Sequence, residues 1–199
     1  MAVLASGYGT NLQALLDDAT TRPWIGLVVS DRDTAVALAR AEAHGVPFAI
    51  VDPARSGDRP AFDAALLEVL RDAEIGYVAL AGYLRMLGPE VVRAYEGRIV
   101  NVHPSLLPSF PGASSVADAL AWGAKVTGVT VHLVDEELDH GPIVAQEAVE
   151  ITDDDDWESL EARIHAVEHR LLPAALRALV EGRVRVDGRR VRVLEAVDG

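Results

Sequence analysis

The chain contains no cysteine. This absence excludes disulfides, thiolate metal ligands and a cysteine nucleophile, and it constrains the redox compartment only weakly. Basic residues are scarce beside acidic ones, 18 against 31, which gives a formal net charge of −13. Because proteins that bind nucleic acids neutralise phosphates with Lys and Arg, this balance argues against a nucleic-acid partner and favours small-molecule substrates.

Long hydrophobic runs are also missing. No stretch approaches the roughly 18 apolar residues of a membrane helix, and the N-terminus lacks the basic region and apolar run of a signal peptide. We therefore expect no membrane partner and a cytoplasmic location. No internal repeat or low-complexity segment is visible, and 199 residues suffice for one domain with a full core, since a domain of this size buries roughly 70% of its unfolded surface.

Short apolar runs rich in β-branched residues alternate with amphipathic stretches of helical length. This pattern predicts an α/β fold with a doubly wound, mostly parallel sheet flanked by helices. The first strand should end near Leu4, and further strands are predicted at 25–29, 48–51, 77–80, 99–103, 128–134 and 143–149. A helix should open after the first strand, and others are predicted at 34–44, 60–71, 89–95, 116–121 and 157–181.

The last segment, 183–193, alternates at period two around Asp187 and Gly188, which predicts a C-terminal β-hairpin. Its arginines could in principle contact nucleic acid, but the acidic remainder of the chain weighs against that. Four aspartates, residues 153–156, precede the long helix, and they suit its positive N-terminus. We interpret them as capping and solubilising residues.

Residues 6–11 form a glycine-containing turn between the first strand and helix. Such turns let backbone N–H groups approach a phosphate at the positive end of a helix. The turn lacks the third glycine of a dinucleotide fingerprint and the Gly-Lys-Ser/Thr ending of a P-loop, so neither NAD nor ATP is favoured. On this pattern alone, an anion site and a plain tight turn remain equally open.

Asn101 and His103 lie two residues apart on a predicted strand that ends at Pro104. Their side chains should therefore share one face at the carboxyl edge of the sheet, where α/β folds place ligands. A structural Asn and His remain an alternative. Asp139, in a later acidic loop, could orient such a histidine or stabilise its charge, as suits a proton donor near neutral pH.

Four segments in chain order carry a resemblance: Ser-Gly-Tyr-Gly-Thr-Asn-Leu-Gln at 6–13, Ala-Gly-Tyr-Leu-Arg-Met-Leu at 81–87, Asn-Val-His-Pro-Ser-Leu-Leu-Pro at 101–108, and Glu-Leu-Asp-His-Gly-Pro-Ile at 137–143. Together they resemble the phosphoribosylglycinamide formyltransferases, which are folate-dependent enzymes of purine synthesis with a Rossmann-like fold. The segments at 101–108 and 138–142 are specific to folate formyltransferases in general. The turn at 7–11 is typical of this member of the group.

The resemblance implies roles for individual residues. The implied catalytic residues are Asn101, His103 and Asp139. The implied contacts to phosphoribosylglycinamide are Gly9, Thr10, Asn11 and Glu168. The implied folate contacts are Arg59, Leu84, Arg85, Met86, Leu87, Asn101, Asp135 and Asp139. The anionic glutamate tail of folate gives both arginines a physical reason to be there, although Arg85 could instead only brace its loop.

The implied reaction is direct transfer of a formyl group from 10-formyltetrahydrofolate, as co-substrate, to the amine of phosphoribosylglycinamide. Asn101 and protonated His103 would stabilise the oxyanion, with no metal or redox cofactor. We expect a monomer or homodimer with one domain over residues 1–199. Its phosphoribosyl half would span about 1–100, and its folate and catalytic half about 80–199. His132 also matches a family position, where we expect a structural or supporting role.

The chain departs from the family at Ser114 and Ser115, where a histidine is usual, and in its short first strand. Three alternatives remain open. The chain could formylate methionyl-tRNA or an amino sugar nucleotide, although the tRNA enzyme carries a further basic domain. It could hydrolyse formyltetrahydrofolate, although that enzyme carries an N-terminal regulatory domain. It could also be a folate- or phosphate-binding protein without activity.

Overall fold

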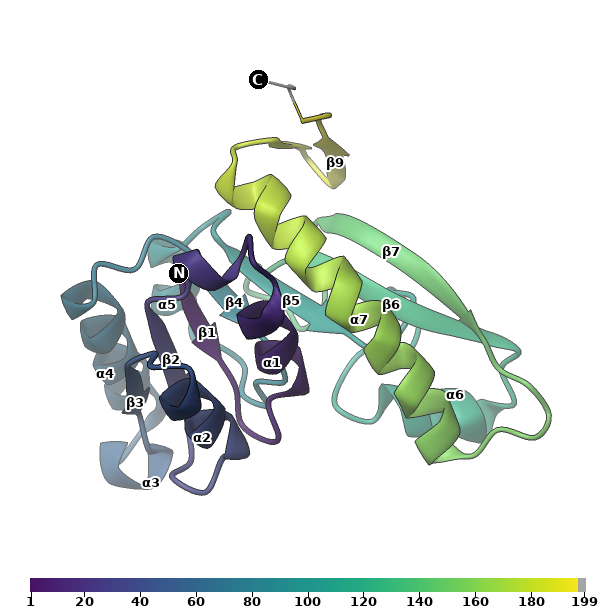
Figure 1. Ribbon diagram of the computed structural model, residues 1–199, viewed down its shortest axis with the longest axis horizontal. Coiled ribbons are helices and arrows are strands. Elements are labelled where there is room, and N and C mark those ends of the chain that lie inside the picture. The colour runs from purple at the N-terminus through teal and green to yellow at the C-terminus, as the bar shows by residue number, and fades with distance from the viewer. Residues whose placement is uncertain (197–199) are drawn as a thin grey trace. The chain divides into compact units, whose positions relative to one another are not determined.

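A computed structural model describes residues 1–196. The chain divides into two compact units, residues 1–100 and the residues from 101 onward. Within the described range, seven strands form one sheet in the order β3-β2-β1-β4-β5-β6-β7, and β8 and β9 form a separate hairpin (Figure 1). The sheet is mostly parallel and flanked by helices, which confirms the predicted fold class.

The first unit alternates strands and helices. Its strands are β1 (Ala2–Leu4), β2 (Leu27–Ser30), β3 (Phe48–Ile50), β4 (Val78–Leu80) and the start of β5 (Ile99–His103). Its helices are α1 (Thr10–Asp17), the 3₁₀ turn η1 (Arg22–Trp24), α2 (Val36–Ala43), α3 (Pro53–Ser56), α4 (Arg59–Asp72) and α5 (Pro89–Ala94).

β1 lies at the centre of this unit. It pairs in parallel with β2 on one side and with β4 on the other. All three of its residues are fully buried. Because a parallel strand is covered by helices on both faces, it reads as a continuous apolar run, as Ala2, Val3 and Leu4 do. Although β1 is short, it is an inner strand of the sheet, so its length does not affect a sheet edge.

The second unit begins within β5. It continues with α6 (Ser115–Trp122), β6 (Val126–Leu133), β7 (Ile143–Glu150), α7 (Trp157–Val180), β8 (Val184–Asp187) and β9 (Arg190–Val193). β6 and β7 pair antiparallel, with a register shift between Val131 and His132. α7 packs along both of these strands (Figure 1). Its buried face includes Leu160, Ile164, Leu172 and Leu176 at helical spacing.

Asp156 begins α7 with a capping box. Its carboxylate accepts the N–H of Ser159 at 2.8 Å, and the hydroxyl of Ser159 accepts the N–H of Asp156 at 3.1 Å. The neighbouring Asp155 accepts two hydrogen bonds from Arg163 on the same helix. These contacts confirm the capping interpretation for Asp156.

The predicted strands and helices are all present, with boundaries that differ by at most two residues. Two short elements, η1 and α3, have no periodicity that sequence reasoning could use. The hairpin is confirmed at β8 and β9. The single domain stays a prediction. No helix among residues 1–196 is long and apolar enough to cross a membrane.

Candidate active site

Asn101 and His103 lie at the carboxyl end of β5, which stops before Pro104. The two side chains point to the same face because successive residues of a strand alternate. Asn101 is half-buried, whereas His103 is only 5% exposed. A buried imidazole requires partners for its ring nitrogens, and the loops around β5 supply them.

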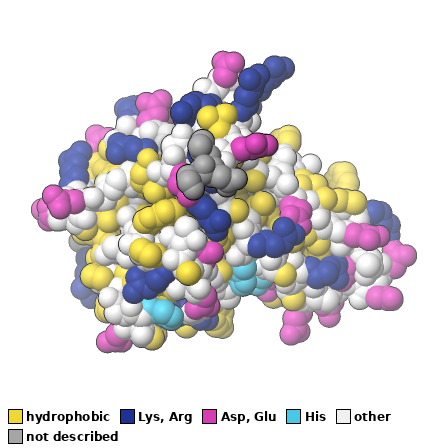
Figure 2. All heavy atoms as spheres, turned by 45° about the horizontal axis from the view of Figure 1, so that its top comes forward, with side chains coloured by type: hydrophobic (Ala, Val, Ile, Leu, Met, Phe, Trp, Pro, Cys, Tyr) yellow, Lys and Arg dark blue, Asp and Glu magenta, His cyan; other side chains and the backbone are white. Residues whose placement is uncertain are grey.

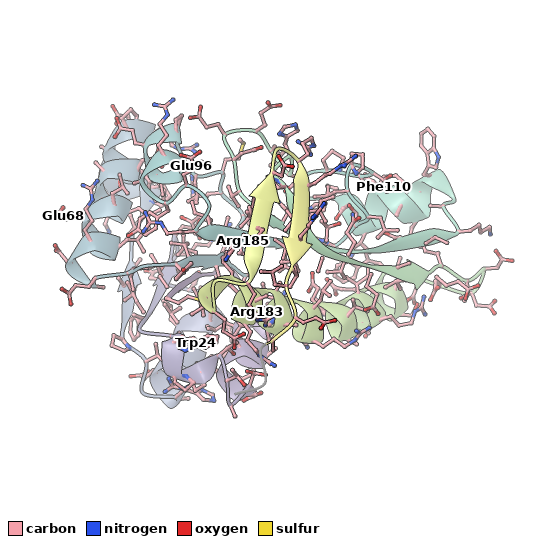
Figure 3. The ribbon with its side chains drawn as sticks, turned by 90° about the horizontal axis from the view of Figure 1, so that it is seen from above. Trp24, Glu68, Glu96, Phe110, Arg183 and Arg185 are labelled. Carbon is pink, nitrogen blue, oxygen red and sulfur yellow. The ribbon has the colours of Figure 1, made fainter. Side chains whose placement is uncertain are left out.

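His103 is held at both ring nitrogens. Its Nδ1 lies 3.5 Å from Oδ2 of Asp139. Its Nε2 lies 2.9 Å from the backbone oxygen of Phe110, a residue labelled in Figure 3 in the loop between β5 and α6. The N–H of Gly112, in the same loop, donates to Oδ2 of Asp139 at 2.7 Å. The loop at 104–114 therefore contacts both members of the His103–Asp139 pair.

Asn101 is oriented by His132 near the end of β6. Nδ2 of Asn101 lies 3.1 Å from Nε2 of His132, and Nδ1 of His132 lies 2.8 Å from the carbonyl oxygen of Leu133. Burial lowers the pKa of His132, which favours the neutral ring. A neutral ring with its proton on Nδ1 donates to Leu133 and accepts from Asn101. This tautomer fixes which end of the carboxamide is the amino group.

The same carboxamide faces Asp139, whose Oδ1 lies 3.5 Å from Nδ2 of Asn101 and 3.8 Å from Nε2 of His132. Asn101, His103, His132 and Asp139 thus form one connected group, called here the β5 cluster. Sequence reasoning gave His132 a supporting role, and it missed the backbone groups of Phe110 and Gly112. Backbone contacts of this kind leave no side-chain signal in a sequence.

The loop that carries Asp139 is tightly constrained. Asp139 has a φ of 50°, in the left-handed region that costs a non-glycine residue about 1–3 kcal/mol. Two residues later, a Cβ on Gly141 would overlap the carbonyl oxygen of Leu133. Because glycine has no Cβ, the chain can turn back against the end of β6 directly after Asp139.

In the first unit, the turn at 6–11 leads from β1 into α1. Gly9 has a φ of 70°, and a Cβ there would lie 2.8 Å from Cβ of Ala37 on α2. Arg40, also on α2, donates to the carbonyl oxygen of Tyr8 at 2.8 Å. A helix leaves its first N–H groups without intrahelical partners, so this turn presents donors at a positive helix end. The arrangement can accommodate a phosphate.

A second segment of the first unit, residues 82–88, follows β4. The Ser6 side chain joins it to the turn, since the N–H of Leu84 donates to Oγ of Ser6 at 3.0 Å. The side chains of Leu84 and Met86 are 63% and 46% exposed, although both are apolar.

These observations coincide with similarity to known proteins. Residues 1–176 match the formyl transferase family. The chain belongs to this family. Phosphoribosylglycinamide formyltransferase of Bacillus subtilis (strain 168) is 43% identical over 182 residues, which cover 90% of this chain and 93% of the relative. The protein of the same name from Mycobacterium tuberculosis (strain CDC 1551 / Oshkosh) is 46% identical over 192 residues, covering 95% and 88%.

Solved structures agree. Glycinamide ribonucleotide transformylase 1 from Symbiobacterium toebii has a TM-score of 0.94 and 46% identity, and the match covers 98% of this chain and 93% of that one. The resemblance to the phosphoribosylglycinamide formyltransferases that the four sequence segments carry is therefore confirmed.

Within this formyl transferase, the two arginines predicted to bind the folate tail have partners in the chain. Nε of Arg85 lies 3.0 Å from Oδ2 of the buried Asp31, and its guanidinium lies 5.6 Å from the centroid of the Phe62 ring. Nε of Arg59 lies 3.1 Å from Oδ2 of Asp63. These contacts favour the alternative in which Arg85 braces its loop.

The remaining predicted residues lie elsewhere in the formyl transferase fold. Glu168 is a buried residue of α7, and its Oε2 lies 3.9 Å from Nε2 of His165. Ser114 and Ser115 stand at the start of α6, where Ser115 is 2% exposed. Asn101, His103 and Asp139 come together in the second unit. Gly9, Thr10 and Asn11 lie in the first unit, in the turn whose Ser6 contacts the 82–88 segment.

Proposed function

We propose that this formyl transferase moves the formyl group of 10-formyltetrahydrofolate to the amine of 5-phosphoribosylglycinamide, a step of de novo purine synthesis. The β5 cluster carries this proposal, because it gathers an amide donor, an imidazole and a carboxylate in one connected group. The relatives at 43% and 46% identity bear the name of this activity, and they support the choice of acceptor.

The chemistry needs an oxyanion donor and a route for one proton. The amine attacks the formyl carbon, and the carbonyl electrons move onto oxygen to give a tetrahedral oxyanion. Collapse of this species breaks the bond to N10 of the folate, while one proton passes from the attacking amine to N10. The products are the formylated amine and tetrahydrofolate, and no covalent enzyme intermediate is required.

Protonated His103 supplies one donor to the oxyanion in this scheme. Its Nε2 lies 2.9 Å from the Phe110 carbonyl, so the oxyanion would replace that carbonyl as the acceptor. Asp139, 3.5 Å from Nδ1, stabilises the imidazolium by Coulomb attraction that burial strengthens. Asp139 would also help move the proton through water.

Asn101 supplies the second donor. One hydrogen of its amino group is directed at His132 and the other at Oδ1 of Asp139, 3.5 Å from Nδ2, so the oxyanion would take the place of Asp139 as the second acceptor. Removing one such donor in an enzyme typically costs about 10²–10³ in rate. The rest of the acceleration would come from holding the two substrates in line.

The binding residues are assigned by the same reasoning. Gly9, Thr10 and Asn11 would bind the substrate phosphate at the N-terminus of α1, and the carboxylate of Glu168 would contact the same substrate. Leu84, Met86, Leu87 and Asn101 would bind folate together with the loop at 135–139, while Arg85 would hold the 82–88 segment in place. Arg59, 48% exposed, would meet its glutamate tail. In this proposal, one domain divides into a phosphoribosyl half and a folate and catalytic half.

The test follows absorbance as the purified protein is mixed with 10-formyl-5,8-dideazafolate, with and without phosphoribosylglycinamide. Turnover that requires the amine, with the formylated product identified by mass spectrometry, is the expected result. Consumption of the folate without the amine would replace the proposal with a hydrolase. Binding of the folate without any turnover would leave a non-catalytic binder.

A further inference from the structure

The C-terminal hairpin concentrates basic residues that the proposed reaction does not use. Five arginines lie between residues 183 and 192 of a chain whose net charge is −13. Figure 2 shows acidic and basic side chains interspersed over one face of the molecule. Arg183 and Arg189 each make hydrogen bonds within the chain.

The hairpin is anchored at its base and packed along one side. Nη1 of Arg183 donates to the carbonyl oxygen of Leu194 at 2.9 Å, where the hairpin leaves α7 (Figure 3). Val184 pairs with Val193, and Val186 with Val191, so one face is apolar and the opposite face carries the charged residues. β9 also packs against β7. These contacts limit where the tip of the hairpin can lie.

The tip contacts the residue after Asp139. Gly188, with a φ of 56°, makes the turn and projects Arg189. Nη2 of Arg189 donates to the carbonyl oxygen of His140 at 2.6 Å, and Nη1 lies 2.9 Å from Nε2 of the same residue. Nδ1 of His140 lies 2.7 Å from Oδ2 of Asp135. A neutral His140 with its proton on Nδ1 satisfies both contacts, because it donates to Asp135 and accepts from Arg189.

The loop held in this way is densely acidic. Residues 135–139 include four carboxylates in five positions, and Asp139 adopts a strained φ of 50°. Like charges this close disfavour a compact loop. The guanidinium of Arg189 is a cation at the end of a chain of hydrogen bonds that reaches Asp135 through His140. The guanidinium of Arg189 therefore offsets the repulsion among these carboxylates and links the two ends of the loop, Asp135 and His140.

We propose that Arg189 is a positioning residue, and that the C-terminal hairpin is a strap that holds the loop at 135–140 in the conformation that places Asp139 beside His103. The inference rests on the proposed function, in which this loop binds folate and supplies Asp139. Arg189 acts through His140 and touches neither substrate.

Hydrogen exchange of the intact protein tests the strap without any substrate. The variants are Arg189→Ala and, as a matched control, Arg192→Ala, which removes an exposed arginine opposite Arg185 on the same hairpin. We expect amides of residues 136–141 to exchange about tenfold faster in Arg189→Ala than in the wild type and in Arg192→Ala. Equal exchange in the two variants would overturn the proposal, and so would faster exchange throughout Arg189→Ala.

Steady-state kinetics then tests the effect on the site. In Arg189→Ala we expect kcat/KM for 10-formyl-5,8-dideazafolate to fall about three- to tenfold, with KM for phosphoribosylglycinamide unchanged. Arg189→Lys should restore this only in part, because an ammonium cannot bond both atoms of His140 as a guanidinium does. A wild type without amine-dependent turnover would refute the proposed function. The hydrogen-exchange experiment would still show whether Arg189 holds the loop at 135–140. An equal rise in KM for both substrates would contradict the positioning role.

Discussion

Oδ2 of Asp139 lies 3.5 Å from Nδ1 of His103, and both side chains are less than a tenth exposed. The same oxygen accepts the N–H of Gly112 at 2.7 Å, which holds the carboxylate against the loop that also contacts His103. Because solvent screens buried charges weakly, this pair can stabilise an imidazolium more than an exposed pair could. The relationship links the acidic loop to the end of β5.

His132 should matter through Asn101 alone. His132→Leu removes the acceptor 3.1 Å from Nδ2 of Asn101 and leaves the carboxamide free to turn, so kcat should fall about tenfold with little change in either KM. Steady-state kinetics beside His44→Leu, which changes a partly exposed histidine of the first unit, checks this. An unchanged kcat in His132→Leu would show that Asn101 needs no such support.

Stability should decline on the acid side. Burial lowers the pKa of His132 from its ordinary 6.5, so the unfolded chain binds this proton more readily than the folded protein does. The free energy of unfolding therefore falls as the pH drops below 6.5 towards the folded pKa. Thermal unfolding across that range should show a smaller loss in His132→Leu than in the wild type. An identical dependence of the unfolding temperature on pH in the two proteins would refute this linkage.

Gly141 should tolerate no side chain. In Gly141→Ala the Cβ would overlap the carbonyl oxygen of Leu133, so residues 135–141 must shift and kcat/KM should drop about a hundredfold. Gly76→Ala is the matched control, because a Cβ there meets no atom within 4 Å. Activity assays and thermal unfolding of both variants provide the comparison. A Gly141→Ala protein as active as the control would mean that the loop conformation is not required.

Arg85 should act on folate through the shape of its loop. Arg85→Ala and Asp31→Asn each break the 3.0 Å contact, and each should raise the folate KM about tenfold, with no further loss in the double variant. The increase should be the same for a folate analogue that lacks the glutamate tail. If Arg85→Ala raised KM only for the folate that carries the glutamate tail, Arg85 would instead contact that tail directly.

The sequence predicted the fold well because its signals are local. Periodicity located the strands and helices, and the Asp187-Gly188 pair located the hairpin. Asn101 and His103 were linked by strand alternation alone, which fixes a shared face. The partnership with Asp139 depended on where a loop 36 residues beyond His103 returns, and only the structure measures that distance.

Other features of the site had no signal in the sequence. The contacts of Phe110 and Gly112 use backbone atoms, which every residue type carries. The hydrogen bond from Asn101 to His132 joins two strands, and it depends on a ring tautomer set by burial. Arg85 and Arg59 matched folate positions by type, but charge alone does not reveal that Asp31 and Asp63 lie within reach.

Formyl transfer by Asp139→Asn tests the central claim most directly. The wild type, Asp139→Asn and the exposed control Asp154→Asn are mixed with saturating 10-formyl-5,8-dideazafolate and phosphoribosylglycinamide, and transfer is followed in a single turnover. If Asp139 stabilises the charge on His103 and assists the proton, transfer in Asp139→Asn falls by about 10²–10⁴, while Asp154→Asn matches the wild type. Transfer by Asp139→Asn at the wild-type rate would contradict the account.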